Sequence, residues 1–400
     1  MPRYAYLTCE LKSRDLDSRL LIARHLLQKG ISVVVGQQWS MVENIETSPS
    51  GVFLFKTANK IQTVNIERAK RRHRVVAMDE EALAICDPMH LRMIVDPNAI
   101  SLADLFLYHS AEHRSALAGD GPIVGSPRLD LLQSERALFD AETAKCKSAG
   151  PYILLNTNFA LVNSVWGAPQ NVVKIATQAW HLGHISESEA REFFQSWIDT
   201  ESANMKLLVE VLQWLSSHRQ GRRIVVRPHP AENAAAWSNV PGVEVVAGTN
   251  PIPWILGADL TLHCNSTTGL EASYLGCHAL NVNPLPTSVF SNVYVTNASP
   301  FQAHTLEEAQ AAITAFLAGE KQSPPVPAQV PRAADLIATH IASLAREESE
   351  LRHWKKHPLG AAAAAKFTLF PDEFKARLSA LGITVKPRQL DASLFLLSPA

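Results

Sequence analysis

The segment Arg227 to Pro230 reads Arg-Pro-His-Pro and directly follows an apolar run that predicts a buried strand. Arg227 offers a planar fork for a phosphate or carboxylate, His229 can donate a hydrogen bond to an anionic oxygen, and the two prolines, the second of which is Pro230, fix the loop. Glu232 follows at the start of a predicted helix. A rigid turn with a solvated histidine would give the same pattern, but the position after a strand favours an anion site.

A second polar segment, His263 to Ala272, begins at the end of another predicted strand and enters a predicted helix near Thr268. Hydroxyl groups and backbone N–H groups at the start of a helix form an anion site, and Glu271, one turn into the helix, could accept from ribose hydroxyls. A serine or threonine N-cap with Glu271 as its capping-box partner would give the same pattern. The residues that we expect at this site are Asn265, Ser266, Thr267, Thr268 and Glu271.

Two asparagines, Asn156 and Asn158, follow the predicted strand Tyr152 to Leu155. This strand opens the second half of the chain, so its carboxyl end should lie near the two segments described above. We expect the asparagines to contact the ligand, although an Asx turn would use the same residues.

Three acids, Asp79, Glu80 and Glu81, follow the predicted strand Val75 to Met78. Neighbouring carboxyl groups repel each other, so at least one should have a raised pKa if the group is buried. Such a carboxyl group suits a general base or a nucleophile that attacks an anomeric carbon. The acidic first turn of a helix is the structural alternative.

Two arginines in the first half of the chain are further candidates: Arg14 follows the first predicted strand, and Arg128 lies in a turn and helix start after Pro122 to Val124. Both are candidates to hold an anionic group of a donor, because a guanidinium matches carboxylate and phosphate geometry. The alternatives are a solvated loop for Arg14 and structural pairing with Asp130 for Arg128.

Short apolar runs alternate with segments of helical periodicity, which predicts parallel sheets with helices on both faces. The long stretch after residue 155, to about Gln213, is predicted to be helical, as are Ser134 to Lys147, Ala333 to Leu351 and Pro371 to Leu381. The predicted strands are Tyr4 to Cys9, Ile31 to Val35, Val52 to Phe55, Val75 to Met78, Leu105 to Tyr108, Tyr152 to Leu155, Arg223 to Val226, Val243 to Val246, Leu260 to His263 and Ala279 to Val282.

The alternation restarts after Ser148 to Pro151, where we place a domain boundary. We expect an N-terminal Rossmann-like domain over 1–148 and a C-terminal, nucleotide-sugar-binding Rossmann-like domain over 149–322. A Pro-rich linker and a helical extension are expected over 323–400. Because ligands of such sheets bind outside the carboxyl ends of the strands, we expect the polar segments to line a cleft between the domains.

Composition excludes several classes of function. The 400 residues are 46% hydrophobic and 19% charged, with a net charge of -1, so no basic field exists to hold nucleic acid. The five cysteines form no CxxC pair, which fits a reducing compartment. No signal peptide or membrane span is evident, so we expect a cytoplasmic protein, with peripheral association to the inner membrane left open.

Several common motifs are missing from the sequence. It has no GxGxxG after the first strand, no GxxxxGK[ST], no GxSxG and no HExxH. It also lacks Asp-x-Asp directly at the end of a predicted strand, which disfavours a metal-dependent transferase. We therefore expect no metal and no cofactor, with side chains and helix N-termini neutralising a leaving phosphate.

Six segments, in order over roughly residues 5 to 285, resemble the bacterial surface carbohydrate biosynthesis protein group. That group is similar to GT-B glycosyltransferases, and more distantly to the Kdo transferases of capsule and O-antigen synthesis and to bacterial sialyltransferases. The segments are Glu10 with Arg14 to Leu16, Asp79 to Glu81, Gly125 to Asp130, Asn156 to Phe159, Arg227 to Glu232 and Asn265 to Ala272.

The resemblance implies a binding site for the CMP part of a donor. In those relatives a His-Pro motif and a Ser-Ser/Thr motif of the C-terminal domain bind CMP. By that resemblance His229 and Pro230 lie at the CMP phosphate, and Ser266 and Thr267 bind the same phosphate.

The resemblance also implies that Glu81 is the catalytic carboxylate. This carboxylate looks like a nucleophile in the retaining Kdo enzymes and is a base in the inverting sialyltransferases. The chain has Ala82 where the relatives have glycine, and Ser126 where they have asparagine. Because the first departure changes the residue after Glu81, Glu80 and Glu232 stay candidates.

Together these observations predict a metal-independent GT-B glycosyltransferase of surface polysaccharide synthesis. It would transfer a sugar, Kdo or a related ulosonic acid, from a CMP-activated donor to a glycan or lipid-linked glycan. A nucleotide-sugar 2-epimerase or a polyol-phosphate transferase of the same fold are alternatives. A non-catalytic scaffold in polysaccharide assembly is the alternative from another class.

Overall fold

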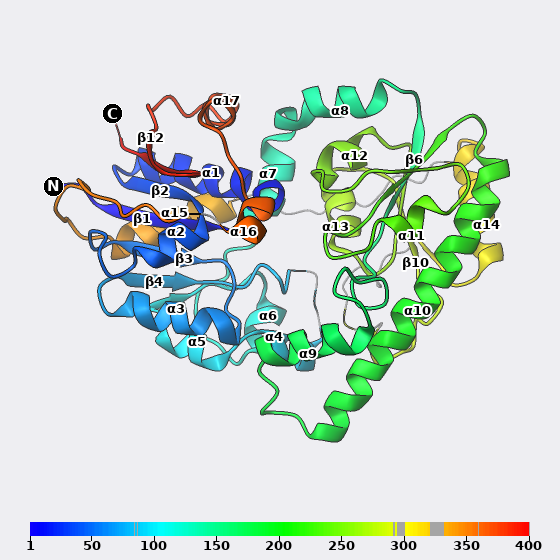
Figure 1. Ribbon diagram of the computed structural model, residues 1–400, viewed down its shortest axis with the longest axis horizontal. Helices are drawn as coiled ribbons and strands as arrows, with labels where there is room; N and C mark the ends of the chain where they lie inside the picture. The colour runs from blue at the N-terminus through cyan, green and yellow to red at the C-terminus, as the bar shows by residue number, and fades with distance from the viewer. Residues whose placement is uncertain are drawn as a thin grey trace. The chain divides into compact units, whose positions relative to one another are not determined.

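A computed structural model describes residues 1–83, 85, 87–290, 293, 301–320, 332–358 and 360–399. The described chain forms two compact α/β units, each built on its own sheet (Figure 1). Unit 1 comprises Met1–Leu83, Leu91–Leu138 and Val330–Ala400, and unit 2 comprises Ala84–His90 and Phe139–Gln329.

The sheet of unit 1 has the described strand order β12-β13-β2-β1-β3-β4-β5. The five strands from β1 to β5 run parallel, and β1, β2 and β3 are buried at every residue, as expected where helices cover both faces. The strands are β1 (Tyr4–Cys9), β2 (Ser32–Gln37), β3 (Val52–Phe55), β4 (Arg74–Ala77), β5 (Leu105–Phe106), β12 (Arg388–Asp391) and β13 (Leu394–Leu397).

Helix α1 (Lys12–Gln28) is central to unit 1, because it packs against α7, α15 and strands β1 and β2. Its buried residues include the polar Asp15, Ser18 and Arg19 beside apolar ones, so this helix carries charge into the interior. The other helices are α2 (Gln38–Glu43), α3 (Lys60–Lys70), α5 (Pro97–Leu102), α6 (Ala111–Ala116), α7 (Pro127–Ser134), α15 (Ala333–Leu344), α16 (Ala361–Lys366) and α17 (Pro371–Ala380), and α4 (Pro88–Ile94) has residues in both units.

The C-terminal segment belongs to unit 1 and contains strands as well as the predicted helices. Helices α15 and α17 lie within the predicted helical segments, although α15 ends at Leu344 and not at Leu351. In addition, β12 and β13 form a hairpin that extends the sheet antiparallel to β2. The close approach requires Gly36, whose φ is 141° and whose Cβ would lie 2.2 Å from the carbonyl oxygen of Ser393. The prediction of a purely helical extension is therefore incomplete.

The sheet of unit 2 is parallel throughout, with the described strand order β11-β10-β9-β6-β7-β8. Such a sheet, with helices on both faces, confirms the predicted class of two doubly wound α/β domains. The strands are β6 (Tyr152–Asn156), β7 (Arg223–Arg227), β8 (Val243–Val245), β9 (Leu260–His263), β10 (Ala279–Val282) and β11 (Gln302–Ala303).

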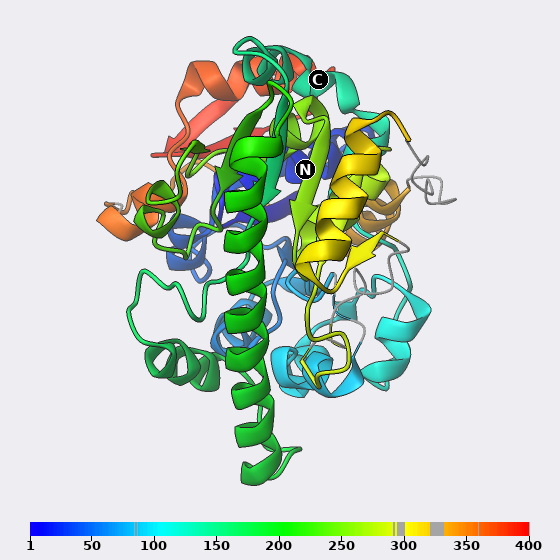
Figure 2. The same ribbon diagram turned by 90° about the vertical axis from the view of Figure 1, so that its right-hand side faces the viewer.

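Helices cover both faces of this second sheet. Helix α10 (Glu187–His218) and α14 (Leu306–Leu317) pack together over one face (Figure 2), and α12 (Pro251–Gly257) and α13 (Thr267–Tyr274) lie on the other. Although α10 has 32 residues, neither it nor any other helix in the described part of the chain has the length and apolar character of a membrane span. The remaining helices are α8 (Asp140–Lys147), α9 (Pro169–Ala179), α11 (Ala235–Ser238) and the 3-10 helix η1 (Arg136–Phe139).

Two predicted helices are divided in the structure. The charged helix expected over Ser134 to Lys147 is split into the end of α7, η1 and α8. The long helical stretch expected to about Gln213 begins with a loop and contains α9 and α10, separated at residues 180–186. Helix α10 starts at a complete capping box between Ser186 and Glu189, and this local signal fixes its first residue.

Candidate active site

Three neighbouring strands of unit 2 bring predicted site residues together at their carboxyl ends. Asn156, Arg227 and His263 end β6, β7 and β9, and Asn156 is in register with both of the others. The structure therefore brings the predicted donor-site segments to one edge of the sheet. The loops after these strands, with α13, contain the other predicted donor-site residues of this unit: Asn158, His229, Pro230, Asn265, Ser266, Thr267, Thr268 and Glu271.

Several buried polar atoms at this edge have no hydrogen-bond partner among the described residues. They are both side-chain heteroatoms of Asn156, Nδ1 of His263 and Oδ1 of Asn265. Each of these side chains is at least 96% buried, and an unsatisfied buried polar group costs about 1–3 kcal/mol. Because most buried polar atoms in folded proteins are hydrogen-bonded, this edge is chemically suited to receive water or a polar ligand.

The turn between β9 and α13 is held in a fixed geometry. Asn265 has φ 45°, a left-handed conformation that asparagine tolerates, and its N–H donates to Oδ1 of Asn281 at 3.2 Å. The Oγ of Ser266 accepts from the N–H and the hydroxyl of Thr268, at 3.2 and 2.9 Å. Thr267 is the half-buried first residue of α13. The positive end of the α13 dipole therefore faces this edge.

Glu271 is not the capping-box partner that one interpretation of the sequence requires. The N-cap of α13 is Ser266, so the third helical position, where a capping-box acid must stand, is Gly269. Glu271 lies two residues further on and its side chain is 1% exposed. It is therefore a buried carboxylate beneath the edge, with its role as a ribose acceptor still a prediction.

His263 is a buried histidine against the first turn of α13. Its side chain is 2% exposed, and burial lowers its pKa to about 4, so the ring is neutral near pH 7. A Cβ at Gly269 would lie 2.3 Å from Cε1 and Nε2 of the His263 ring. The glycine therefore leaves the space that the ring occupies.

Gly269→Ala is expected to lower the free energy of unfolding by about 1–3 kcal/mol, because the added methyl group overpacks a buried site. Chemical denaturation measures this loss. The matched control is Gly360→Ala, where a Cβ would meet no atom within 4 Å. A neutral Gly269→Ala would show that the His263 ring can move away without cost.

The histidine and the arginine of the Arg-Pro-His-Pro segment differ in exposure and in their hydrogen-bond partners. Nδ1 of His229 accepts from the N–H of Ala231 at 3.2 Å, so the neutral ring carries its proton on Nε2. His229 and Pro230 are exposed. Arg227 is 7% exposed and donates from Nε and Nη2 to the carbonyl oxygen of Thr249. The geometry thus favours His229 as a donor toward a ligand and Arg227 as a support for the adjoining loop.

Glu232 connects the loops that follow β6 and β7. Its carboxylate accepts from Thr157 Oγ1 at 2.6 Å, from His229 N at 3.0 Å and from Trp237 Nε1 at 3.0 Å. Phe159 N and Asn163 Nδ2 donate to it as well. Because five donors surround a side chain that is 4% exposed, the carboxylate anchors these loops. This geometry argues against the catalytic role that the sequence left open for it.

A second buried carboxylate, Glu201, anchors the same loop after β6. Leu161 N donates to its Oε2 at 3.0 Å, Val162 N donates at 3.2 Å, and Trp197 Nε1 donates to Oε1 at 2.6 Å. Burial raises the pKa of Glu201 to about 8. Because Glu201 lies in the middle of α10, the sequence does not indicate that its carboxylate anchors the loop after β6.

Stability is expected to fall as the pH rises, because of Glu201. The raised pKa means that the folded state binds the proton more tightly than the unfolded state, whose value is 4.5. This contribution is therefore lost as the pH rises toward about 8. The melting temperature of the native protein should drop between about pH 4.5 and about pH 8 more steeply than that of Glu201→Gln, because the unfolded state loses this proton near the lower value and the folded state near the upper one. Parallel curves would contradict this prediction.

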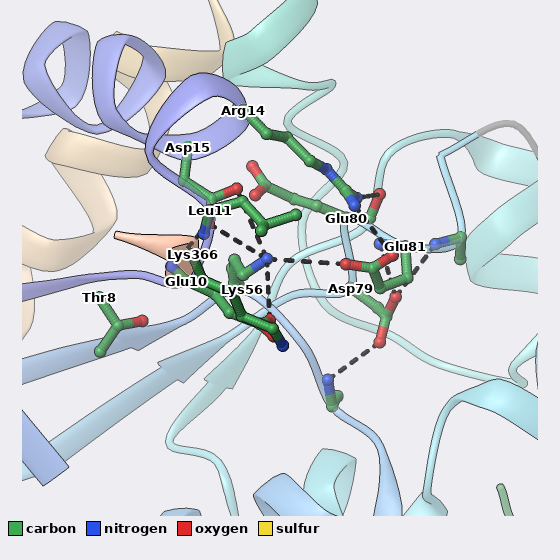
Figure 3. A network of polar contacts seen from close by, with 12 residues as sticks. Thr8, Glu10, Leu11, Arg14, Asp15, Lys56, Asp79, Glu80, Glu81 and Lys366 are labelled. Carbon is green, nitrogen blue, oxygen red and sulfur yellow. Dashed lines mark hydrogen bonds and ion pairs between the residues drawn. The ribbon is translucent and has the colours of Figure 1, made fainter. Parts of the chain in front are cut away.

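The acidic turn of unit 1 follows β4, and its first residue is structural (Figure 3). Asp79 is fully buried, and its carboxylate accepts from Ala58 N at 2.9 Å and from Glu81 N and Ala82 N at 3.0 Å each. Burial raises the pKa of Asp79 to about 6. Of the three acids only Asp79 has a raised pKa, and burial contributes more to this shift than repulsion by Glu81.

The two glutamates of this turn differ in exposure and in partners. Glu80 is 8% exposed and is held bidentately by Arg19, at 3.1 and 2.6 Å. The side chain of Glu81 is 39% exposed and contacts Arg14 at 3.1 Å and Lys56 at 3.6 Å. Burial opposes its ionisation, but Arg14 and Lys56 outweigh this effect and lower the pKa of Glu81 to about 2. Glu81 is therefore an ionised carboxylate that solvent can reach.

The two arginines of unit 1 that are predicted to bind an anion have different surroundings. Arg14 pairs with Glu81 and also donates to the backbone oxygen of Glu80 at 3.3 Å, so it belongs to the acidic turn. Arg128 is half-buried in the first turn of α7. The binding of a donor carboxylate by either residue stays a prediction.

Lys56 is the residue of this cluster that sequence reasoning missed. It directly follows β3 and its side chain is 2% exposed, yet it contacts Asp15 at 3.2 Å and Glu10 at 3.5 Å as well as Glu81. The rule that polar residues after strands form the site would have selected it. Glu10 also accepts from Lys366 of the C-terminal segment at 2.9 Å, a contact that no local pattern predicts.

Nowhere in the described residues do three His, Cys, Asp or Glu side chains gather to hold a metal ion.

No protein-family model and no curated protein matches the chain. Solved structures do match its fold. A UDP-GlcNAc 2-epimerase from Methanocaldococcus jannaschii shares 11% identity at a TM-score of 0.52, covering 86% of this chain and 100% of its own.

Two further solved structures are similar to the chain. A putative UDP-N-acetylglucosamine 2-epimerase from Listeria monocytogenes has a TM-score of 0.51 at 11% identity, with 86% of this chain and 96% of that chain covered. The wall teichoic acid polymerase TagF has a TM-score of 0.44 at 10% identity, covering 85% and 88%. With two Rossmann-like units, one on a parallel sheet and one whose strands β1 to β5 are parallel, the chain has the GT-B fold.

Proposed function

We propose that the protein is a glycosyltransferase that moves a sugar from a nucleotide-activated donor to a glycan. The observation that carries the proposal is the polar carboxyl edge of unit 2. There Asn156, His263 and Asn265 present buried polar atoms without a partner among the described residues, next to the N-terminus of α13. A nucleotide offers many donors and acceptors, and its phosphate suits the positive end of a helix.

In this proposal unit 2 binds the donor. The N–H at Nε2 of His229 and the groups at the start of α13, with Thr267 and Ser266, receive the phosphate. These donors would stabilise the charge on the departing nucleotide, so the reaction needs no metal. The donor is proposed to be CMP-activated Kdo or a related ulosonic acid, because of the resemblance carried by the segments around Glu81, His229 and Ser266.

Glu81 would act at the anomeric carbon. A general base works best when its pKa lies near the working pH, whereas the pKa of Glu81 is lowered to about 2, with burial opposed by Arg14 and Lys56. A carboxylate that stays ionised is better suited to attack the anomeric carbon or to stabilise positive charge there. This favours the nucleophilic role over the role of a base.

The experiment that tests the proposal offers CMP-Kdo, CDP-linked polyols and UDP-N-acetylhexosamines in turn, with and without a glycan acceptor. Release of CMP together with a glycan larger by one ulosonic acid is the expected result. Turnover of UDP-GlcNAc without an acceptor, with inversion at carbon 2, would instead identify an epimerase. The fold likeness to two proteins described as UDP-GlcNAc 2-epimerases makes this the second candidate.

Absence of binding to any nucleotide in a thermal-shift screen would contradict both enzymatic functions and favour a scaffold. The proposed partners are the nucleotide sugar and a glycan or lipid-linked glycan. A cytoplasmic location, with or without peripheral contact to the inner membrane, belongs to the same proposal.

His229→Ala is expected to weaken donor binding about 10-fold, because one charge-assisted hydrogen bond to the phosphate is lost. Isothermal calorimetry with the intact donor, or with the free nucleotide, measures the affinity. His218→Ala is the matched control, since His218 is an exposed histidine at the end of α10. Equal affinities in the two variants would remove His229 from the donor site.

A further inference from the structure

Lys56 is a buried ammonium group surrounded by carboxylates. Its Nζ contacts Asp15 Oδ2 at 3.2 Å, Glu10 Oε2 at 3.5 Å and Glu81 Oε1 at 3.6 Å (Figure 3). A lysine that is 2% exposed is tolerated only if its charge is paired. An ammonium has three N–H donors, so one lysine can hold three carboxylates where a planar guanidinium would favour one.

The three carboxylates around Lys56 are not equivalent. Asp15 is 1% exposed, and its Oδ2 accepts from Glu10 N at 2.7 Å and from Leu11 N at 2.9 Å, so it is fixed by the backbone. Glu81 is 39% exposed, and no backbone N–H of the described residues donates to its carboxylate. Lys56 therefore links a rigid, buried carboxylate to one that solvent can reach.

The two oxygens of Glu81 are held by two different cations. Arg14 contacts Oε2 at 3.1 Å, and Lys56 contacts Oε1 at 3.6 Å. The side chain of Arg14 is 23% exposed, whereas that of Lys56 is 2% exposed. Other charged groups also lie near Glu81. Asp15 comes from α1, and Asp79 and Glu80 belong to the same turn as Glu81. Glu10 contacts Lys56 as well.

We infer that Lys56 is the positioning residue of Glu81, which it holds ionised and oriented for reaction at the anomeric carbon. The inference rests on the proposed function, because it assigns Lys56 a task in the same chemistry. Lys56 touches no reacting atom and acts through the carboxylate. Arg14 alone would hold one oxygen, leaving the carboxylate free to rotate.

The test replaces Lys56 with methionine, which keeps the length of the side chain and removes its charge. Because Asp15 would then be a buried, unpaired charge, a second variant combines Lys56→Met with Asp15→Asn, whose amide oxygen can still accept from Glu10 N and Leu11 N. The matched control is Lys12→Met. Lys12 lies on the same helix as Asp15, and its ammonium group pairs with Glu373 at 3.0 Å.

The first readout is a carbon NMR titration of the Glu81 carboxyl group, assigned by its loss in Glu81→Gln. The pKa of this group is expected to rise by about 1–3 units in Lys56→Met and to stay unchanged in Lys12→Met. The rise should be smaller in the double variant, because Asp15→Asn removes a negative charge that itself raises this pKa. The second readout is the acid limb of kcat/KM for sugar transfer, which should move to higher pH by the same amount. An unmoved pKa in a folded Lys56 variant would overturn the inference.

The two readouts separate this inference from the proposed function. The titration needs no substrate, so it decides on Lys56 even if no donor is turned over. If the native protein transfers no sugar from any donor, the proposed function fails and the titration alone judges the charge on Glu81. If transfer occurs and its acid limb stays in place in the Lys56 variants, the function stands and the inference fails.

Discussion

Glu81→Gln is expected to lower kcat for sugar transfer about 10³-fold while donor affinity stays within about two-fold of the native value. Glutamine keeps the shape of the side chain but removes the charge that Arg14 and Lys56 stabilise. The side chain is 39% exposed, so the change leaves no cavity. Both cations keep other acceptors, namely the Glu80 backbone oxygen for Arg14 and Asp15 for Lys56. Steady-state kinetics and calorimetry measure the two quantities.

The control for this prediction is Glu10→Gln, which removes a carboxylate from the same network. Glu10 is bound to Lys56 at 3.5 Å and to Lys366 at 2.9 Å and is 27% exposed. Its loss should lower the rate less than about 10-fold, because Asp15 still pairs with Lys56 and an exposed ion pair such as the one with Lys366 contributes little. If Glu81→Gln and Glu10→Gln behave alike, the effect comes from the charge of the network and Glu81 has no chemical role.

Intact-mass measurement with a CMP-ulosonic acid donor distinguishes the two roles of Glu81. A nucleophile forms a covalent adduct, with the mass of the sugar residue added to the protein, and Glu81→Gln abolishes it. A base leaves the protein mass unchanged. The low pKa of Glu81 favours the adduct, because an ionised carboxylate with little affinity for protons is a poor base.

The strands β1 to β10 could be predicted well, because each contains a short apolar run, whereas the two-residue strand β11 was not recognised. The bounds predicted for β3, β9 and β10 agree with the structure at both ends. The C-terminal hairpin could not be recognised, since β13 is a short apolar run whose partner, β2, lies more than 350 residues earlier in the chain. Local patterns carry no information on such distant pairing.

The location of the site could also be predicted from the sequence, because parallel strands share one carboxyl edge. This principle selected Asn156 and the segments at His229 and Ser266, which the structure brings to one edge. The partner that each side chain finds there could not be predicted. Arg227 and Glu232 were as suitable as His229 by residue type, yet Arg227 supports Thr249 and Glu232 is enclosed by five donors.

The same difficulty applies to the acidic turn. Three adjacent acids have equal standing in the sequence, but Asp79 accepts from the backbone, Glu80 is paired with Arg19, and Glu81 faces two other cations. The decisive partners, Arg19 and Lys56, lie 61 residues before Glu80 and 25 residues before Glu81. Their burial depends on tertiary packing, and a buried charge in a helix such as α1 has no local pattern.

Arg19→Met is expected to destabilise the protein by about 3–5 kcal/mol, because it leaves the carboxylate of Glu80 buried without its partner. The guanidinium is fully buried and contacts both oxygens of Glu80, and its Nε also donates to the backbone oxygen of Thr8 at 3.3 Å. Urea denaturation followed by circular dichroism measures the loss. A change below about 1 kcal/mol would mean that solvent reaches Glu80 and replaces the arginine.

The double variant Arg19→Met with Glu80→Met completes this prediction and decides between the two glutamates. Replacing a buried ion pair with apolar side chains of similar size is often neutral or stabilising, so the double variant should recover most of the stability that Arg19→Met loses. If Glu80 only holds the turn in place, the double variant should also keep sugar transfer within about 10-fold of the native rate. A folded double variant without activity would make Glu80 the reacting carboxylate, because its fold would then exclude a structural cause. Glu81, with its two cations and its access to solvent, is expected to keep that role.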